Sequence, residues 1–459
     1  MRLTKLPLSL GRVSAQRRGL TFVGGSRSRG GVNRTLIPLI ASMLLSTGLS
    51  AAKPPNIVLI ISDDQAWTDY SFMGHEAIET PNIDRLAKQS RLFKRGYVPS
   101  SLCCPSLASI ITGLYPHQTK ITGNEPPIPP EGKRSAEYQR RVQKCVSFID
   151  TVPTLPRLLA KRGYVSHQSG KWWQGHYSRG GFTHGMTHGD PKRGGRHGDE
   201  GLKIGRQGMK EIFDFIDDAG EKPFFVWYAP FLPHTPHNPP KRLFDKYAKK
   251  TESKFIARYW AMCEWFDETC GQLLDHLDEK KLADNTIVLY VTDNGWIQRA
   301  DNGRYAPRSK RSQYDGGLRT PIMVRWPGKV KPGERPELAN SIDLAPTILK
   351  ACGLEPTSEM QGIDLLDDKA LGKRKSTYGA VYLHNAVDIQ KPSANLTYRW
   401  LIDGNWKLIL PHKPNNNPDA ESELYNLTKD PFERQNLAES KASRVKRLTK
   451  QLNALLPES

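Results

Sequence analysis

The sequence predicts an α/β fold with a mixed or doubly wound β-sheet flanked by helices, and two apolar segments carry most of that prediction. Residues 56–62 and 285–292 are continuous apolar runs of strand length, as expected of strands that are buried on both faces of a sheet. Helix-like stretches lie between them, at residues 81–89, 154–162, 209–218 and 259–277. Strands that alternate with helices indicate an α/β architecture. The 459 residues, with an ordinary apolar fraction of 37%, suffice for a large buried core.

The first 52 residues have the pattern of a basic leader and export signal. Eight Lys or Arg residues and no acid occupy the first 34 positions, and an apolar run follows from Leu36 to Leu49, before small residues at 50–52. The run is shorter than the roughly 20 residues that a spanning helix needs. We therefore expect a periplasmic or secreted protein that begins near Ala52, without stable membrane insertion. A non-cleaved anchor is the alternative, although a proline and a glycine interrupt the run.

Charge and cysteine content narrow the function classes. The formal net charge is +20, and it stays positive without the leader, which suits an anionic substrate or a polyanion surface. We expect no nucleic-acid partner. Six cysteines form no spacing typical of a disulfide framework or a zinc cluster. Cys103 and Cys104 are adjacent, so a bond between them would be strained, and Cys263 and Cys270 fit the core of a helix.

Oxygen-bearing side chains follow both predicted strands. Asp63 and Asp64 come directly after the first strand, and Asp293 and Asn294 directly after the second. Functional sites in open α/β sheets form at the carboxyl ends of the strands, and carboxylates with a carboxamide are hard ligands suited to Ca²⁺ or Mg²⁺. Each pair alone would be read as a helix cap or a turn. Their recurrence after two buried strands favours a shared cation site.

A helix is predicted from the region of Cys103 and Pro105 to Thr112, with Gly113 after its end. Its N-terminus, with free N–H groups and positive potential, would face Cys103 and any anion bound beside it. Three cationic side chains in loop-like contexts are candidates to meet that anion: Lys171, His234 and Lys310. The sequence around each of them is equally consistent with a surface cation.

The remaining segments predict a long loop and a small second domain. Residues 176–208 are rich in Gly, His and Arg without a period, so we expect a loop. Short strand signals at 401–403 and 406–410 are followed by a polar turn and an amphipathic helix near 442–455. We place the domain limits at residues 1–52 for the leader, 53–372 for the main domain and 373–459 for a smaller α+β domain with an antiparallel sheet.

Short motifs recur in a fixed order along the chain, and together they are highly specific. They are Asn56-Ile-Val-Leu-Ile-Ile-Ser-Asp-Asp64, Thr80-Pro-Asn-Ile-Asp-Arg-Leu86, Cys103-Cys-Pro-Ser106, Thr112-Gly-Leu-Tyr-Pro-His117, Gly170-Lys-Trp172, Pro233-His-Thr-Pro236, Thr292-Asp-Asn-Gly295, Tyr314-Asp-Gly-Gly-Leu-Arg-Thr-Pro321, Gln361-Gly-Ile-Asp364 and Glu423-Leu-Tyr-Asn-Leu427. On these motifs the chain, from residue 56 to 437, resembles the formylglycine-dependent, arylsulfatase-like sulfatase family of the alkaline-phosphatase superfamily. The resemblance implies an alkaline-phosphatase-like mixed sheet, with the catalytic domain at residues 53–372.

The resemblance also implies a chemistry for the site. It implies that a maturation enzyme converts Cys103 to formylglycine (3-oxoalanine), whose hydrate supplies the nucleophilic oxygen. One divalent cation, Ca²⁺ or else Mg²⁺, would be held by five residues, Asp63, Asp64, Asp293, Asn294 and the modified Cys103. Lys171, His234 and Lys310 would then grip the sulfate or protonate the leaving oxygen.

Two positions depart from the family pattern. Leu107 stands where the Cys-x-Pro-Ser motif continues with Arg, and Trp173 stands where a His follows the Lys. We expect Leu107 near the face of Cys103 on a helix, and Trp173 on the same side as Lys171 in an extended segment. Three readings follow: a sulfatase whose His-rich loop (His176, His184, His188 and His197) supplies a substitute; a phosphodiesterase or phosphonate hydrolase that uses unmodified Cys103 or another nucleophile; and a non-catalytic binder of sulfated glycans.

We favour the first reading because the other ligand and cation positions are intact. The predicted function is hydrolysis of a sulfuric ester. We expect a sulfated carbohydrate rather than a free aryl sulfate, because an exported enzyme meets polyanions and because Trp172 and Trp173 are placed to border a sugar.

Overall fold

The computed structural model describes residues 53–416 and 418–457, which belong to one compact unit. The predicted leader and export signal at residues 1–52 lie outside the described residues. Within the described ranges, no helix combines the length and the apolar character needed to cross a bilayer.

The larger of two sheets has nine strands among the described residues, in the order β4-β3-β5-β1-β6-β7-β2-β8, with β9 beside β2. β3, β5, β1 and β6 are parallel, while β7 is antiparallel to both β6 and β2, so the sheet is mixed. Its strands are β1 Asn56–Ser62, β2 Arg91–Tyr97, β3 Val165–Gly170, β4 His184–Gly185, β5 Phe224–Ala229, β6 Thr286–Thr292, β7 Arg319–Arg325, β8 Gly333–Arg335 and β9 Ala339–Asn340.

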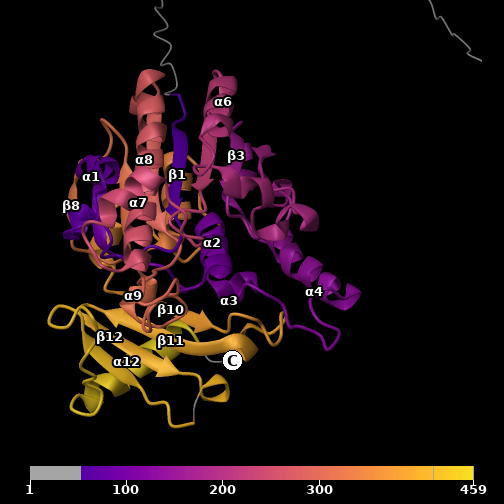
Figure 1. The fold of residues 1–459 in the computed structure, drawn as a ribbon. Coiled ribbons are helices and arrows are strands. Elements are labelled where there is room, and N and C mark those ends of the chain that lie inside the picture. The colour runs from indigo at the N-terminus through magenta and orange to yellow at the C-terminus, as the bar shows by residue number, and fades with distance from the viewer. Residues whose placement is uncertain (1–52, 417, 458–459) are drawn as a thin grey trace, which may run out of the picture. The chain divides into compact units, whose positions relative to one another are not determined.

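Helices cover both faces of this sheet (Figure 1). β1 shows the consequence, because its alternate side chains enter two different cores. Ile57, Leu59 and Ile61 pack into the core that contains α2, α5 and α10, whereas Val58 and Ile60 pack into the core that contains α1, α6 and α8. The helices are α1 Pro81–Lys88, α2 Cys103–Thr112, α3 Pro116–Thr119, α4 Ala136–Ser147, α5 Leu155–Ala160, α6 Lys210–Ala219, α7 Lys241–Tyr247, α8 Lys254–Glu279, α9 Asp315–Leu318, α10 Leu344–Ala351, α11 Asp368–Lys373 and α12 Ala442–Leu455.

The second sheet is antiparallel and has the order β10-β11-β12-β13. Its strands are β10 Ser376–Tyr382, β11 Leu396–Asp403, β12 Trp406–Pro411 and β13 Glu423–Asn426, and α12 packs Leu448 and Leu452 against it (Figure 1, orange to yellow). The Ala380 N–H of β10 donates to the Pro99 carbonyl at 2.9 Å, so this sheet contacts the loop that precedes α2. The predicted fold class, a mixed α/β sheet with a smaller antiparallel sheet, is confirmed.

The segment 176–208 differs from the prediction of a plain loop. It contains the two-residue strand β4 and four short 3-10 helices, at Tyr177–Gly180, Pro191–Arg193, Gly195–His197 and Asp199–Lys203. Buried Asp199 holds it together by accepting hydrogen bonds from the N–H groups of His188 and Asp190. A glycine-rich sequence without a period was predicted to be a plain loop, but this segment has its own hydrogen-bonded structure.

Candidate active site

The carboxyl ends of four parallel strands meet at one edge of the large sheet, and each supplies a predicted site residue. Asp63 and Asp64 follow β1, and Lys171 follows β3. His234 lies in the loop after β5, and Asp293 and Asn294 follow β6. This edge is where open α/β sheets place their ligands.

The two acidic clusters contact each other directly. The Asp64 N–H donates to Asp293 Oδ1 at 3.1 Å, and the Asn294 side-chain amide donates to Asp64 Oδ1 at 2.6 Å. Asp63, Asp64, Asp293 and Asn294 are at most 2% exposed. Asp64 adopts a left-handed backbone with φ of 65°, a conformation that Asp tolerates better than most residues.

Two lysines neutralise part of this negative charge. Lys171 Nζ lies 2.7 Å from Asp63 Oδ1, and Lys310 Nζ lies 2.7 Å from Asp64 Oδ2. Burial alone would raise the pKa of Asp64, but Lys310, His234 and Lys171 together hold it below its ordinary value. Burial is also the largest single influence on Lys171 and lowers its pKa, but Asp63, Cys103 and Asp293 together outweigh it, so the lysine pKa is raised. Against burial, the pKa of Lys310 is raised as well, chiefly by Asp64. Both ammonium groups are therefore charged at neutral pH.

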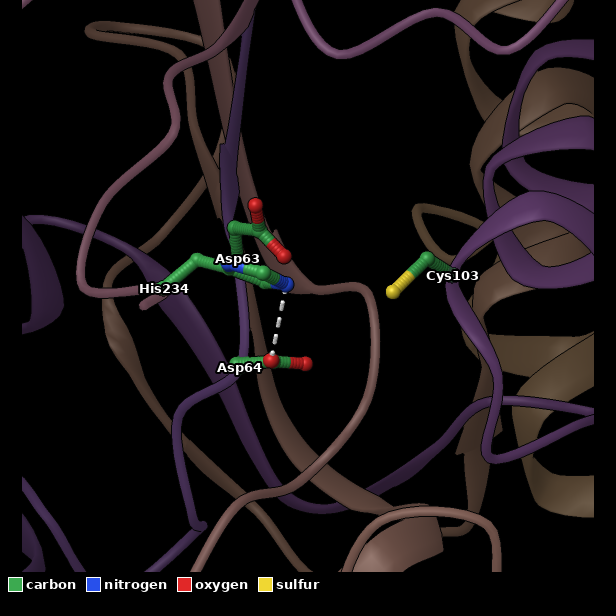
Figure 2. Close-up of side chains that lie close together, drawn as sticks. All are labelled: Asp63, Asp64, Cys103 and His234. Carbon is green, nitrogen blue, oxygen red and sulfur yellow. Dashed lines mark ion pairs between the residues drawn. The ribbon is translucent and has the colours of Figure 1, made fainter. Parts of the chain in front are cut away.

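His234 faces the acidic cluster through one ring nitrogen (Figure 2). Its Nε2 lies 3.3 Å from Asp64 Oδ2, and its Nδ1 is 2.6 Å from the Thr235 carbonyl, which can only accept a hydrogen bond. Nδ1 therefore carries the proton, and the lone pair of Nε2 points toward the carboxylate. Burial, followed by Lys171, lowers the pKa of His234 well below its ordinary value, so the imidazole is neutral at pH 7.

Cys103 approaches the cluster from the opposite side, at the first residue of α2. In Figure 2 its sulfur points toward Asp63, Asp64 and His234, and single ligand atoms of these four residues lie within 4.8 Å of one another. Lys171 Nζ is 3.4 Å from the sulfur. In the protein alone, burial raises the pKa of the Cys103 thiol to about 12, against the opposing influence of Lys171 and Lys310. Unmodified Cys103 would then be an uncharged thiol at neutral pH, and a weak nucleophile.

A cavity of about 790 Å³ opens beside these groups. Cys103, Lys171, His234 and Lys310 all line it. The structure thus brings all eight predicted site residues to one place. Four line the cavity, and the other four, Asp63, Asp64, Asp293 and Asn294, are buried next to it and contact one another or the two lysines.

The two departures from the family pattern lie differently from what the helix and strand spacings predicted. Leu107 packs into the hydrophobic core, because on α2 it turns away from the cavity. Trp173 has φ of 72°, so the segment after Lys171 is not extended, although Trp173 still lines the cavity. The prediction that Trp172 borders a sugar is wrong, since Trp172 is 1% exposed and packs on Phe182 and Trp227.

One histidine of the 176–208 segment reaches the cavity. His197 lines it, with its ring centroid 5.3 Å from that of Trp173. Burial, then Lys171, lowers the pKa of His197. The other three loop histidines do not line this cavity.

Several cavity residues have no signal in the sequence. Asn124 and His384 come from distant loops that share no motif with Cys103, and only the tertiary fold brings them there. Asn124 Oδ1 accepts the N–H of Cys104 at 3.0 Å, which helps to hold the start of α2. Arg311 follows a predicted site residue directly, and that adjacency is the one sequence hint that was missed.

Two family models match the chain. A family model described as Sulfatase matches residues 55–354, and one described as N-sulphoglucosamine sulphohydrolase, C-terminal, matches residues 303–458. The N-acetylgalactosamine-6-sulfatase of Canis lupus familiaris is 30% identical over 380 residues, which cover 72% of this chain and 69% of the relative.

Solved structures share the fold. The putative sulfatase yidJ from Bacteroides fragilis has a TM-score of 0.71 at 20% identity and covers 90% of this chain and 98% of its own. A protein solved in complex with its substrate D-glucosamine-2-N,6-O-disulfate has a TM-score of 0.67 at 22% identity, and covers 88% of this chain and 97% of its own.

Proposed function

Because this chain belongs to the sulfatase family and is a sulfuric ester hydrolase, we propose that it cleaves a sulfated carbohydrate with formylglycine made from Cys103 and one divalent cation. The observation that carries the proposal is the convergence of Asp63, Asp64, Asp293 and Asn294 across the cavity edge from Cys103, between two buried lysines. Neither strand end alone makes such a site. The fold brings together the residues that follow β1 and those that follow β6.

The residues present fit a hard cation. Three oxygens are buried without a hydrogen-bond donor: Asp63 Oδ2, Asp293 Oδ2 and Asn294 Oδ1. A buried carboxylate oxygen that lacks a donor is costly, and a cation removes that cost. Oxygen donors of this kind favour Ca²⁺ or Mg²⁺. Asp63, Asp64, Asp293, Asn294 and the oxygen of a modified Cys103 would hold the ion, which would supply positive charge beside the sulfate.

Formylglycine suits position 103 better than cysteine does. In the protein without a cation, burial raises the pKa of the thiol and makes it a weak nucleophile at neutral pH, whereas the hydrate of formylglycine would supply a hydroxyl to attack sulfur. Leu107 is a core residue, so its replacement of the family Arg leaves the packing beneath Cys103 intact. We propose that the maturation enzyme acts on this chain despite Leu107.

The remaining polar groups have roles that follow from charge and geometry. Lys171 and Lys310, both charged, would bind the sulfate oxygens and stabilise the negative charge that develops on them. His234 Nε2 lies at the cavity beside Asp64 and, once protonated, would donate its proton to the leaving oxygen as the S–O bond breaks. His197, beside Trp173, would take the place of the family His.

A carbohydrate substrate is supported by the cavity wall. Trp173, Phe231 and Tyr305 are partly exposed, line it and would offer aromatic surface to sugar rings. The N-acetylgalactosamine-6-sulfatase and the complex with D-glucosamine-2-N,6-O-disulfate point to the same class of substrate. We propose export, from the leader pattern at residues 1–52, because sulfated glycans lie outside the cell.

The proposal is tested by sulfate release from sulfated saccharides, aryl sulfates and matched phosphate esters. We expect turnover of at least one saccharide, a loss of about 10³-fold or more in Cys103→Ala, and activity close to wild type in Cys104→Ala. Cys104 is the matched control, because it is the next residue of α2 and its side chain is also buried. Turnover that survives Cys103→Ala, or faster cleavage of the phosphate esters, would contradict the proposal. Activity on aryl sulfates alone would contradict the part of the proposal that names a carbohydrate substrate.

A further inference from the structure

The active-site cavity carries more positive charge than one sulfate needs. Among its lining residues the basic and histidine side chains are Lys171, His197, His234, Arg299, Arg304, Lys310, Arg311 and His384, and no lining residue is acidic. Lys171 and Lys310 are paired with the cluster beneath, and Arg299 forms a bidentate pair with Asp301. Within the described part of the chain, the guanidinium groups of Arg304 and Arg311 contact no carboxylate.

Arg304 lies in a loop that is held by hydrogen bonds between its own residues. The side-chain amide of Gln298 donates to the carbonyls of Arg299, Asn302 and Arg304, at 2.9, 2.7 and 3.3 Å. Asn302 Oδ1 accepts the Arg304 N–H at 2.8 Å. Both backbone polar groups of Arg304 are therefore fixed, while its side chain is exposed at the cavity.

The backbone of Arg311 is also fixed by a hydrogen bond. Its N–H donates to the Ser101 carbonyl at 2.9 Å, two residues before Cys103. Its φ is 67°, a left-handed conformation that costs free energy for a residue other than glycine. Lys310 points into the acidic cluster while the next side chain, Arg311, is exposed at the cavity.

We propose that Arg304 and Arg311 form a second anion-binding subsite, which binds an additional sulfate or carboxylate of the saccharide whose sulfate ester lies at Cys103. The inference rests on the proposed function, because it takes the substrate to be a sulfated saccharide. Guanidinium groups bind both anions through paired N–H donors, and a group without a carboxylate partner loses no ion pair on binding. The subsite selects saccharides with more than one negative charge.

Binding to the full-length mature Cys103→Ala protein tests the subsite independently of turnover. The probes are N-acetylgalactosamine-6-sulfate, the corresponding 4,6-disulfate, and the 6-sulfate linked to a uronic acid, measured by calorimetry. We expect the doubly charged probes to bind about 10–100-fold more tightly than the monosulfate, with the stronger of the two identifying the second anion. Adding Arg304→Gln and Arg311→Gln should bring the three affinities within about threefold.

Two controls separate charge at this place from charge in general. Arg304→Lys with Arg311→Lys should keep part of the preference, and Arg134→Gln, an exposed arginine that does not line the cavity, should keep all of it. Equal binding of all three probes, an unchanged preference in the glutamine variant, or no binding of any probe would overturn the subsite. Failure of the proposed function would give a different result. The wild-type protein would then keep an intact Cys103 thiol and release no sulfate, while the three binding affinities would remain as expected here.

Discussion

Three buried oxygens define the chemistry of this site more sharply than any motif does. Asp63 Oδ2, Asp293 Oδ2 and Asn294 Oδ1 lack donors, although the Oδ1 atoms of Asp63 and Asp293 accept an ion pair and a hydrogen bond and the Asn294 amide nitrogen donates to Asp64. Spacing along the chain predicted the carboxylates and the amide. It could not predict which of their oxygens would be free, because that depends on contacts between residues more than 200 positions apart.

Metal removal should therefore destabilise the protein as well as inactivate it. We expect a calcium chelator to abolish sulfate release and lower Tm, and excess Ca²⁺ to restore both, because an ion bound only to the folded state adds about 2–4 kcal/mol at 100 to 1,000 times its Kd. Asp293→Asn should lose the Tm response to Ca²⁺, whereas Asp69→Asn should keep it, since Asp69 is a buried carboxyl bound by Tyr259 and Thr68. A Tm that ignores Ca²⁺ in the wild-type protein would contradict the cation site.

His197 is the loop histidine that the structure places at the cavity, and its removal should affect catalysis. We expect His197→Ala to lower kcat about 100-fold, as loss of a group that handles a proton typically does. His184→Ala is the control, because His184 belongs to the same segment but is exposed and lines a different cavity. Equal activity of the two variants in a sulfate-release assay would remove His197 from the mechanism.

At the scale of elements, the apolar runs at residues 56–62 and 285–292 predicted strands correctly. β1 spans the predicted residues 56–62, β6 begins one residue later than predicted, and α12 spans 442–455 as predicted. β3 was missed because its sequence, Val-Ser-His-Gln-Ser-Gly, has no apolar period even though five of its six residues are buried. Ser166, Gln168 and Ser169 find hydrogen-bond partners that only the fold provides, such as the Trp227 carbonyl that accepts from Ser169.

Lys407 of β12 forms a buried charge cluster with Asp315 of α9 and with Glu433. Lys407 Nζ lies 2.8 Å from Asp315 Oδ1 and 2.7 Å from Glu433 Oε1, and all three side chains are at most 2% exposed. Lys407→Met should cost about 3–5 kcal/mol of unfolding free energy, because it leaves two buried carboxylates without a counter-charge. Lys241→Met removes an exposed pair with Asp245 and should cost less than about 1 kcal/mol. Comparable costs of the two in denaturant unfolding would show that the cluster is not stabilising.

For the whole molecule, buried titratable groups make stability depend on pH. Burial, assisted by His184, lowers the pKa of His167 to about 4, so this residue is neutral in the folded protein at pH 5 and protonated in the unfolded chain. The unfolded state then binds more protons, and stability falls as pH drops from about 6.5 toward 4. His167→Gln should lessen the loss between pH 7 and pH 5 by about 2 kcal/mol. An identical pH dependence of the unfolding free energy in both proteins would contradict this assignment.

The overall architecture followed from the sequence, but the cavity did not. Strand-end acids and the Cys103 helix were predictable, since they depend on local patterns and on the general geometry of α/β sheets. The cavity wall joins residues 124, 197, 304 and 384 across loops without any shared period. Leu107 shows the limit of local reasoning, because a position four residues along a helix shares a face with Cys103 only roughly, and here it belongs to the core.

Mass analysis of the peptide from Ser101 to Gly113, from protein made in its native host, tests the central claim most directly. Conversion of Cys103 replaces its –CH₂SH group by an aldehyde, so we predict a peptide that is lighter by that difference, reacts with a carbonyl reagent at position 103 and keeps the thiol of Cys104. A peptide with two intact thiols, from protein that releases sulfate, would contradict the account.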